Sequence, residues 1–443
     1  PPRSTLSSSS AASDVYKRQV DLLTASGAFD EPKEMVRGGF WRNFLVKYEE
    51  SNWMHKRMIA VSELVERASR RGEEAGKGGE AKKALDHLYQ AQCNCAYWHG
   101  LFGGLYLPHL RSAVFTHLIE AENSAASAGE RVPWHEVRDL DGDGVEELVV
   151  HGRDLTAFFK TRGGTLRELD MRSPAFNVTD TLTRRREIYH DKIAVSGNPS
   201  GGAPAGAVSI HDITAAKEAG LERLLRYDAR NRESFLDRFI DAETTLEAFA
   251  GSSCGELGDF LEAIYRLAVD GSGKDARFVF ERRGGVGPAP GERVTVDLVK
   301  RVTMAPSAPR LEVAYAIRPV DGRLDCRFAV ESVFSLLAGD APDRYFRFPG
   351  RDLDDPRLAS TGEERNVDAF SLVDEWLGIE IGIELEPPAL VWRFPIETVS
   401  NSESGFERVY QGSAVTAVWP LAVEAGGEAR FSVRLSAGRG RKG

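Results

Sequence analysis

The amino-acid sequence predicts an α+β protein in which a short α-helical bundle is followed by a large antiparallel β-sandwich. Between residues 43 and 124, apolar residues recur every three or four positions, which is the period of a helix with one buried face. After residue 128 the period falls to two, which is typical of β-strands. The 443 residues are enough for two or three domains. We therefore expect a helical domain over residues 20–128 and a sandwich over residues 129–443.

Three helices are expected in the helical domain. The apolar face that predicts the first helix consists of Met54, Met58, Val61 and Val65. The second helix covers residues 81–92, where Leu85 and Leu88 share one face. The third starts at Pro108, a residue that the first turn of a helix tolerates. The polar, glycine-rich segment RRGEEAGKGGEAK between the first two helices is expected to be a surface loop.

Alternating apolar and polar residues predict the strands of the sandwich. The clearest runs cover residues 148–150, 294–298, 311–317, 379–385 and 431–435. Turns rich in glycine and proline, such as GGVGPAPGE and PVDGR, separate them. Many strands with one solvent-facing side favour two sheets packed face to face. Within this domain, the segment LERLLRYDARNRESFLDRF (221–239) predicts a short helix.

The N-terminal segment, residues 1–19, differs in composition from the rest of the chain. It holds six serines and has no amphipathic period. One interpretation is a disordered leader. The other is a segment foreign to the gene, because SSAASDVYKRQ resembles a translated sequencing adapter. In that case we expect the gene to continue upstream, so that this chain is a C-terminal part of its product.

Charge and hydropathy disfavour two classes of partner. The formal net charge of −10 repels nucleic acid and anionic membrane surfaces, and no apolar run approaches the ~20 residues that cross a bilayer. We expect a soluble, cytoplasmic protein with no nucleic-acid or membrane partner, and a homodimer stays open. The cysteines fit no disulfide or zinc pattern and are expected to be ordinary buried thiols: Cys93, Cys95, Cys254 and Cys326.

The segment AQCNCAYWHGLFGGLYLPHLR (91–111) holds the densest set of candidate binding residues. These are Asn94, Tyr97, Trp98 and His99, followed by Gly100, Gly103 and Gly104. Aromatic rings stack on the apolar faces of pyranose rings, while Asn and His contact sugar hydroxyls. The segment therefore predicts a sugar-binding site. The alternative is that these side chains close a helix and pack in the core.

The segment RDLDGDGVEEL (138–148) predicts a calcium loop. The candidate ligands are Asp139, Asp141, Asp143 and Glu147, with Gly144 at the sharp turn. Carboxylate oxygens suit Ca²⁺, although Val150 stands where the pattern expects a bidentate Glu. The alternative is an acidic turn without an ion. No cofactor is required by any other pattern, so Ca²⁺ is the one possible cofactor.

Two further segments carry polar clusters. TLTRRREIYHD places Arg184, Tyr189 and His190 among further arginines, which fits either a sugar-binding surface or a solvated face of ion pairs. In WRFPIETVSNSESGFERVYQGS (392–413), aromatic and carboxyl groups alternate. A buried polar corner between strands explains that second segment better than a binding edge does.

Five stretches together resemble the C-terminal two-thirds of the α-amylases and 4-α-glucanotransferases of glycoside hydrolase family 57. In chain order they are VRGGFWRNFLVKYEESNWMHKRM, QAQCNCAYWHGLFGGLYLPHLR, GGTLRELDMRSPAFNVTDTLTRRREIYH, RYDARNRESFLDRF and WRFPIETVSNSESGFERVYQGS. The resemblance implies an N-terminal (β/α) barrel, a helical bundle and a C-terminal sandwich of the galactose mutarotase-like kind. It also implies an α-glucan or maltooligosaccharide as substrate.

The resemblance implies roles for single residues. A retaining mechanism needs two carboxylates about 5 to 5.5 Å apart, and the family carries both on barrel segments upstream of the matched region. We therefore expect this chain alone to be inactive, with no catalytic residue in it. The resemblance assigns substrate contacts to Asn94, Tyr97, Trp98 and His99, and it supports the same role for the residues picked out in TLTRRREIYHD. Cys95 stands where the glucanotransferases carry an Asp, which leaves hydrolysis and transfer both open.

Two rival functions remain. One is a free-standing carbohydrate-binding module without chemistry. The other is an aldose-1-epimerase-like enzyme, which needs a His acid and a Glu base. His190, His211 and Glu331 are available for that chemistry, but no spacing joins them into one site.

Overall fold

The computed structural model describes residues 41–99, 103–191, 193, 220–271, 273–304, 306–402 and 405–440. Residues 1–19, His211 and Gly100, on which the sequence analysis placed expectations, lie outside this part of the chain.

Four α-helices of the described part of the chain form the N-terminal layer, one more than the three that the 3.6-residue period predicts. They are α2 (Trp41–Lys47), α3 (Glu49–Glu74), α4 (Gly78–Ala91) and α5 (Pro108–Ser127). Between the last two lie two 3-10 helices, η2 (Asn94–Tyr97) and η3 (Gly104–Tyr106). Pro108 begins α5, where its fixed φ suits the first turn and its missing N–H costs no hydrogen bond.

A five-stranded antiparallel sheet follows the helices. In spatial order its strands are β1 (His135–Arg138), β2 (Glu147–His151), β3 (Leu155–Lys160), β4 (Leu166–Met171) and β5 (Phe176–Asn177). Strands β2 to β4 are buried on both faces, apart from the last residue of β2. The expectation of one solvent-facing side is therefore wrong for this sheet, because the helices cover that side.

The second sheet has eleven strands. Their spatial order along the main path is β6 (Leu236–Ile240), β11 (Leu324–Phe334), β15 (Gly405–Val423), β14 (Ile379–Ser402), β16 (Ala429–Arg439), β10 (Arg310–Pro319), β9 (Val294–Met304), β8 (Arg277–Val286) and β7 (Arg266–Asp270). β13 (Gly362–Asp374) pairs with β14 and with β12 (Arg344–Arg347). Every pairing is antiparallel, as the sequence predicts.

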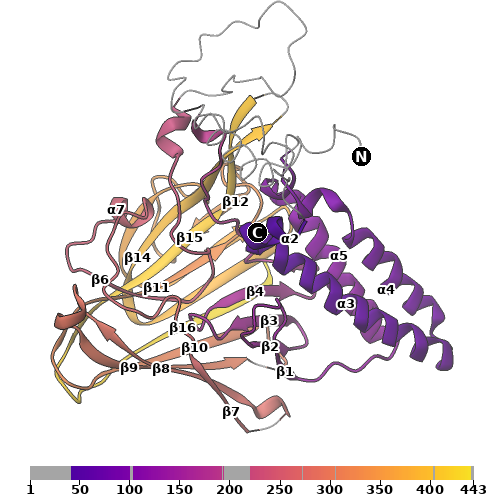
Figure 1. Cartoon of the computed structure of the whole chain (residues 1–443), viewed down its shortest axis with the longest axis horizontal. Coiled ribbons are helices and arrows are strands. Elements are labelled where there is room, and N and C mark those ends of the chain that lie inside the picture. Colours follow the sequence, from indigo (N-terminus) through magenta and orange to yellow (C-terminus); the bar gives the residue numbers. More distant parts are fainter. Residues whose placement is uncertain are drawn as a thin grey trace, which may run out of the picture.

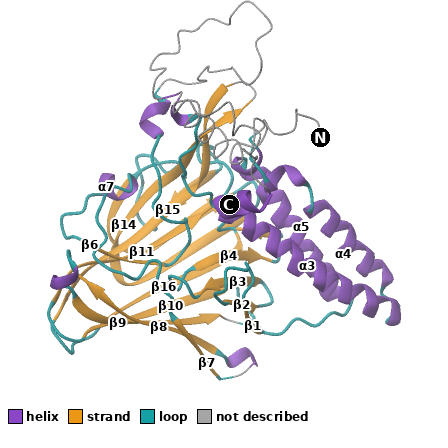
Figure 2. Ribbon diagram, viewed as in Figure 1, coloured by secondary structure: helices purple, strands orange, loops and turns teal. Residues whose placement is uncertain are grey.

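The molecule has three layers, with the five-stranded sheet between the helices and the eleven-stranded sheet (Figures 1 and 2). Alternate residues of its strands explain this arrangement. Val149 and Phe158 pack with the helices, whereas Leu148 and Phe159 belong to the core between the two sheets. The prediction of an α+β protein with a large antiparallel sandwich is confirmed.

The segment predicted as a helix over 221–239 is mostly not helical. Only η5 (Leu221–Leu224) is a helix, and the segment ends in strand β6. Between them the chain has no regular structure, because charged side chains there fold inward to buried partners. Arg232, for example, donates to Asp228 Oδ1 and to Glu331 Oε1. The charged residues of this segment, which were expected on the surface of a helix, therefore hold an irregular segment in place through ion pairs.

The prediction that the cysteines are buried thiols is correct for Cys326, holds in part for Cys254 and is wrong for Cys93 and Cys95. Cys326 is buried and Cys254 half-buried, but Cys93 and Cys95 are exposed. All four are free thiols. The two exposed thiols lie within the first candidate binding segment, Cys93 between α4 and η2 and Cys95 in η2.

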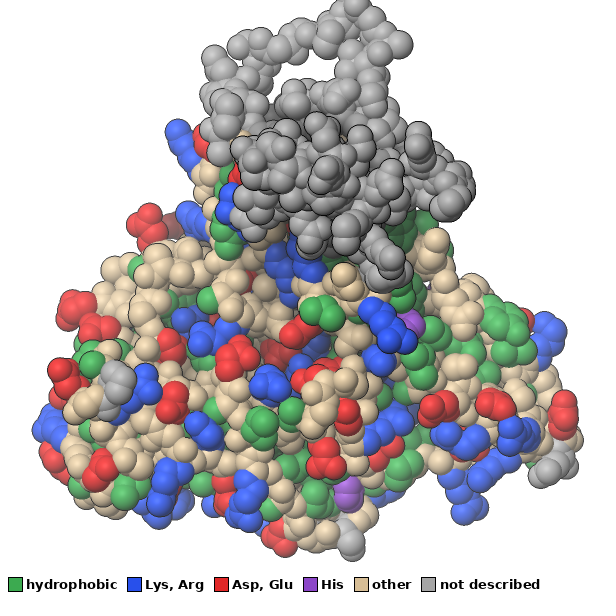
Figure 3. Space-filling model, in the orientation of Figure 1, with side chains coloured by type: hydrophobic (Ala, Val, Ile, Leu, Met, Phe, Trp, Pro, Cys, Tyr) green, Lys and Arg blue, Asp and Glu red, His purple; other side chains and the backbone are tan. Residues whose placement is uncertain are grey.

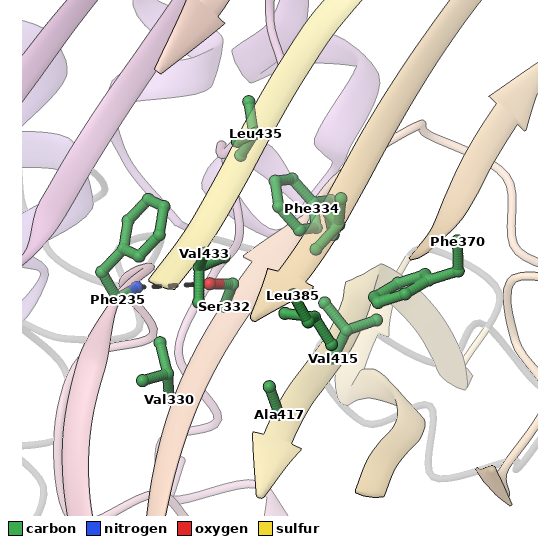
Figure 4. A pocket seen from close by; sticks show the side chains of 11 residues that line it. Phe235, Val330, Ser332, Phe334, Phe370, Leu385, Val415, Ala417, Val433 and Leu435 are labelled. Carbon is green, nitrogen blue, oxygen red and sulfur yellow. Dashed lines mark hydrogen bonds between the residues drawn. The ribbon is translucent and has the colours of Figure 1, made fainter. Parts of the chain in front are cut away.

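A cavity of about 20 Å³ lies in the core between the sheets (Figure 4). Apolar side chains line it, and the hydroxyl of Ser332 accepts the backbone N–H of Phe235 at 3.3 Å. This volume holds one water molecule at most, so the cavity is a packing defect rather than a ligand site.

No helix among the described residues is long and apolar enough to span a membrane.

Buried ion pairs join α3 to the five-stranded sheet. Arg57, 2% exposed, donates from Nε to Glu168 Oε1 at 2.9 Å and from Nη2 to Asp170 Oδ2 at 3.4 Å. It also contacts Glu122 of α5 at 2.9 Å and lies over the ring of Phe158 at 4.2 Å. Burial and the adjacent Glu168 raise the pKa of Asp170 well above its ordinary value. Arg57 thus contacts three carboxyl groups.

Replacement of this cation is expected to destabilise the fold strongly. Arg57→Met should lower the free energy of unfolding by about 3–5 kcal/mol, because it leaves buried carboxylates without a partner. Urea denaturation followed by circular dichroism measures the change. Arg70→Met is the matched control on the same helix, since Arg70 pairs with Glu66 in solvent and should change stability by less than about 1 kcal/mol. Equal losses in the two variants would contradict a special role for the buried pair.

Candidate functional site

The loop between α4 and α5 presents two of the predicted sugar-contacting residues to solvent. Asn94 and Cys95 are exposed, and Trp98 is half-buried. Tyr97 points inward, where its hydroxyl donates to the carbonyl of Ala91 at 2.8 Å. Ser51 Oγ donates to the carbonyl of Tyr97 at 2.5 Å, which ties the loop to α3. An exposed amide and a half-buried indole therefore lie within five residues of this loop, and we call Asn94, Cys95 and Trp98 the Trp98 surface.

Two glycines allow the chain to return against this loop. Gly103 and Gly104 have φ values of +81° and +52°, a region that favours glycine. A Cβ at Gly104 would lie 2.1 Å from the carbonyl oxygen of Trp98. The next residue, Leu105, donates its N–H to that same oxygen at 2.8 Å. The glycines are thus required for a close backbone contact that fixes Trp98.

Beneath the loop lies a set of polar side chains, the Glu187 cluster, in which all members but the half-buried Lys47 are buried. Its members come from three segments and are Lys47, Tyr48, His99, Tyr106, Glu187, Tyr189 and His190. Glu187 Oε1 accepts the hydroxyls of Tyr48 and Tyr106, both at 2.7 Å. Its Oε2 accepts from Lys47 Nζ at 2.7 Å.

Hydrogen bonds determine which nitrogen of each buried histidine carries the proton. His99 Nδ1 donates to the carbonyl of Gly103 at 3.0 Å, so Nε2 accepts from the hydroxyl of Tyr189 at 3.2 Å. His190 Nε2 donates to the carbonyl of Val399 at 2.9 Å, and its Nδ1 accepts the N–H of Glu187. The structure thereby joins two predicted groups of site residues, since His99 contacts Tyr189.

Burial shifts the proton affinity of these groups. It lowers the pKa of His99 and of His190 below the ordinary value, which favours neutral rings. Burial alone would raise the pKa of Glu187, but the charge of Lys47 and the hydrogen bonds from Lys47 and Tyr48 lower it overall. A carboxylate, an ammonium group and neutral imidazoles can therefore coexist inside the protein. Because Tyr97, His99, Tyr189 and His190 are all buried, they support the Trp98 surface rather than form it.

Arg184 belongs to a different network. Its Nε and Nη2 donate to Asp228 Oδ1 at 3.0 and 2.6 Å, and Nη2 also reaches the carbonyl of Ala250. Arg185 pairs with Glu50 at 2.7 Å, and although burial alone would raise the pKa of Glu50, Arg185 and Arg167 lower it to about 2. Both arginines are largely buried, so a solvated face of ion pairs is wrong for them.

A pocket of about 550 Å³ opens beside Arg184. Its wall combines apolar groups, such as Leu246 and Phe394, with charged groups, such as Arg226 and Glu247. This volume lies in the range of small-molecule sites. Arg184 therefore lines a cavity large enough for a sugar, while its own hydrogen bonds go to protein partners.

The hairpin of β14 and β15 contains the predicted polar corner. Gln411, fully buried, accepts from Arg111 Nη2 at 3.0 Å and donates to the carbonyl of Tyr106 at 2.9 Å. It also donates to Thr398 Oγ1 at 2.8 Å. These contacts connect the sandwich to α5 and η3 rather than forming a binding edge.

The acidic loop between β1 and β2 brings three of its four predicted ligands together. Carboxylate oxygens of Asp139, Asp141 and Glu147 all lie within 4.8 Å of one another. Asp143 stands outside this group, because its carboxylate accepts the N–H of Val145 and faces Arg162 at 3.6 Å. Burial and repulsion from Asp141 raise the pKa of Glu147 to about 8.

The epimerase interpretation finds no support in the described geometry. Glu331 is bound by Arg232 and by Arg238, whereas His190 belongs to the Glu187 cluster. These side chains therefore take part in separate networks.

Sequence reasoning missed the central members of the Glu187 cluster. Lys47, Tyr48 and Glu187 all occur in the quoted motifs, but none of them was predicted as a site residue. The sequence cannot pair them, because Tyr48 and Glu187 lie 139 positions apart and no periodic pattern joins residues at that distance.

Two family models match this chain. Residues 39–125 match the model described as "Alpha-amylase/4-alpha-glucanotransferase, middle domain", and residues 139–434 match "Alpha-amylase/4-alpha-glucanotransferase, C-terminal". The chain belongs to this family. The first match includes the Trp98 surface, and the second includes the acidic loop and almost all of the sandwich.

Relatives along nearly the whole chain agree. Alpha-amylase 1 of Dictyoglomus thermophilum is 35% identical over 94% of this chain, and the 4-alpha-glucanotransferase of Thermococcus kodakarensis is 34% identical over 94%. The crystal structure of 4-alpha-glucanotransferase from Thermococcus litoralis superposes with a TM-score of 0.73 at 30% identity and covers 97% of the chain. The chain spans only 55–58% of the length of these three proteins.

The buried histidines of this α-amylase/4-α-glucanotransferase chain predict a pH dependence of stability. Below about pH 6.5 the unfolded chain binds a proton on His99, whereas the folded chain excludes it, so stability falls as pH falls. His99→Asn removes this proton. Between pH 7.5 and 5.5 its stability should therefore decline less steeply than that of the wild type, by up to about 1.4 kcal/mol per pH unit.

Urea denaturation at several pH values measures both slopes. His109→Gln is the control, because His109 is exposed on α5 and solvent reaches its ring in both states. Parallel profiles for wild type and His99→Asn would contradict the prediction.

Proposed function

We propose that this chain is the C-terminal, glucan-contacting part of an α-glucan-processing enzyme of the α-amylase or 4-α-glucanotransferase type. The observation that carries the proposal is the Trp98 surface, where a half-buried indole and an exposed amide lie in a loop that buried hydrogen bonds hold in place. The indole stacks on a pyranose ring, and the amide of Asn94 binds hydroxyls. Tyr97, His99, Tyr189 and His190 hold this surface in place, and Arg184 lines a second pocket for the same glucan.

Electrostatics support a neutral ligand. On the face drawn in Figure 3, acidic and basic side chains are interspersed over helices and sandwich. An α-1,4-glucan carries no charge, so the net charge of −10 does not oppose its approach. The free thiols at Cys93 and Cys95 support a reducing compartment such as the cytoplasm.

The chemistry that the resemblance implies would need carboxylates from outside this chain. The matched segments include no candidate nucleophile or acid, since the resemblance places both on upstream barrel segments. Within the proposal, this chain supplies binding and positioning, and a barrel supplies bond cleavage.

Binding of maltooligosaccharides is expected to depend on Trp98. In gels that contain soluble starch, the wild-type chain should migrate more slowly than in plain gels, and Trp98→Ala should lose at least tenfold in apparent affinity. The reason is the lost stacking surface, worth on the order of 1.5 kcal/mol or more.

Trp376→Ala is the matched control. Trp376 is 78% exposed between β13 and β14, distant in sequence from the loop. Loss of binding in Trp376→Ala with retention in Trp98→Ala would favour the alternative function, a free-standing carbohydrate-binding sandwich. Melting curves of both variants verify folding.

The purified chain alone is expected to show no turnover. Incubation with amylose and with maltotriose should release no reducing ends and form no longer oligosaccharides, compared with a heat-treated sample. Either product above that background would contradict the proposed division of labour.

A further inference from the structure

The acidic loop contains a carboxylate oxygen that the protein leaves without a partner. Glu147 is fully buried at the start of β2. Its Oε2 accepts the N–H of Leu140 at 2.7 Å and, at 3.4 Å, that of Asp141. Its Oε1 is buried and has no hydrogen-bond partner among the described residues. An orphaned oxygen at this depth costs free energy unless another group binds it.

The surroundings of this oxygen are negative. Oxygens of Asp139 and Asp141 lie within 4.8 Å of a Glu147 oxygen and of each other. The nearby cation, Lys160, contacts Asp141 Oδ2 at 3.1 Å and makes no hydrogen bond to Glu147 Oε1. Lys160 thus pairs with one of the three carboxyl groups, and Lys56 Nζ borders the loop at Gly142, but Glu147 Oε1 is left without a hydrogen bond.

Backbone hydrogen bonds shape the loop around the same point. Asp139 accepts the N–H groups of Gly142, Asp143 and Gly144 at 2.8 to 3.1 Å. Gly142 and Gly144 have φ values of +75° and +86°, so the loop turns sharply twice. The three carboxylates converge because the loop is fixed by its own backbone.

From these contacts we propose that the loop of Asp139, Asp141 and Glu147 binds a calcium ion. The donors are all oxygens, which suits a hard cation and disfavours zinc or copper. The ligands come from one short turn and water would complete the shell, an irregular arrangement that Ca²⁺ accepts more readily than Mg²⁺. The ion gives Glu147 Oε1 its missing partner.

Such an ion would also brace the junction of two layers. Asn52 of α3 donates from Nδ2 to the carbonyl of Asp141 at 2.9 Å. The loop thus connects α3 with β2, and a cation that stiffens it stabilises this attachment. The site is independent of the glucan proposal, because none of its residues belongs to the Trp98 surface.

Calorimetric titration of the EDTA-dialysed full chain with CaCl₂ tests the proposal. We expect saturable binding and a rise in melting temperature, and at least tenfold weaker binding in Asp139→Asn and Glu147→Gln. Glu146→Gln is the control, since Glu146 is the exposed neighbour in the same loop and should leave affinity unchanged.

Asp139 is exposed, so its variant keeps the test valid where Glu147→Gln fails to fold. Three results would overturn the proposal. The first is that the wild type shows neither heat of binding nor a shift in melting temperature at 5 mM Ca²⁺, a concentration at about the weak end of protein calcium sites. The second is an unchanged affinity in Asp139→Asn, and the third is tighter binding of Mg²⁺ than of Ca²⁺.

Discussion

The attachment of the helices to the sandwich depends on buried charge. Arg57, Glu50 and Glu187 lie inside the protein, and each meets its partner across the junction between the helical layer and the segment 166–191. Arg111 of α5, with no exposed surface, pairs in the same way with Asp180 at 3.0 Å. A buried charge without its partner is costly, so these ion pairs stabilise the contact between the two layers. The helical and sandwich segments, although distinct in sequence pattern, are one structural unit here.

This constraint explains why the Trp98 surface is so well fixed. The loop between α4 and α5 has little regular structure of its own. It rests on the Glu187 cluster, whose members come from α2 and its C-terminal end, from the loop itself and from the segment after β5. Exposed contact residues thus sit on a base that hydrogen bonds hold from three directions. The arrangement separates side chains that meet a ligand from side chains that position them.

Much of the fold could be predicted from the sequence, because burial imposes its period locally. The apolar faces around Met54 and Val114 are visible in any window of the helices, and so is the alternation around Val313 in the sheet. The predictions that were wrong concern segments whose structure depends on contacts with residues far away in the sequence. The segment 221–239 shows helical spacing but ends in a strand, since Asp228 and Arg232 are bound by residues far along the chain. Likewise, strands β2 to β4 gave no sign that polar residues such as Glu168 face helices rather than water.

The candidate site could also be predicted only in part from the sequence. Aromatic and amide groups near Trp98 were recognisable as residue types, but only coordinates show that Asn94 is exposed and His99 buried.

The exposed thiols of Cys93 and Cys95 give this surface a practical property. Because neither thiol takes part in the Glu187 cluster, a maleimide dye can be attached to Cys93, which precedes the Trp98 surface, while the supporting hydrogen bonds stay intact. The protein therefore carries its own handle for an optical sensor, in which a ligand that covers the indole changes the emission of a fluorophore a few residues away.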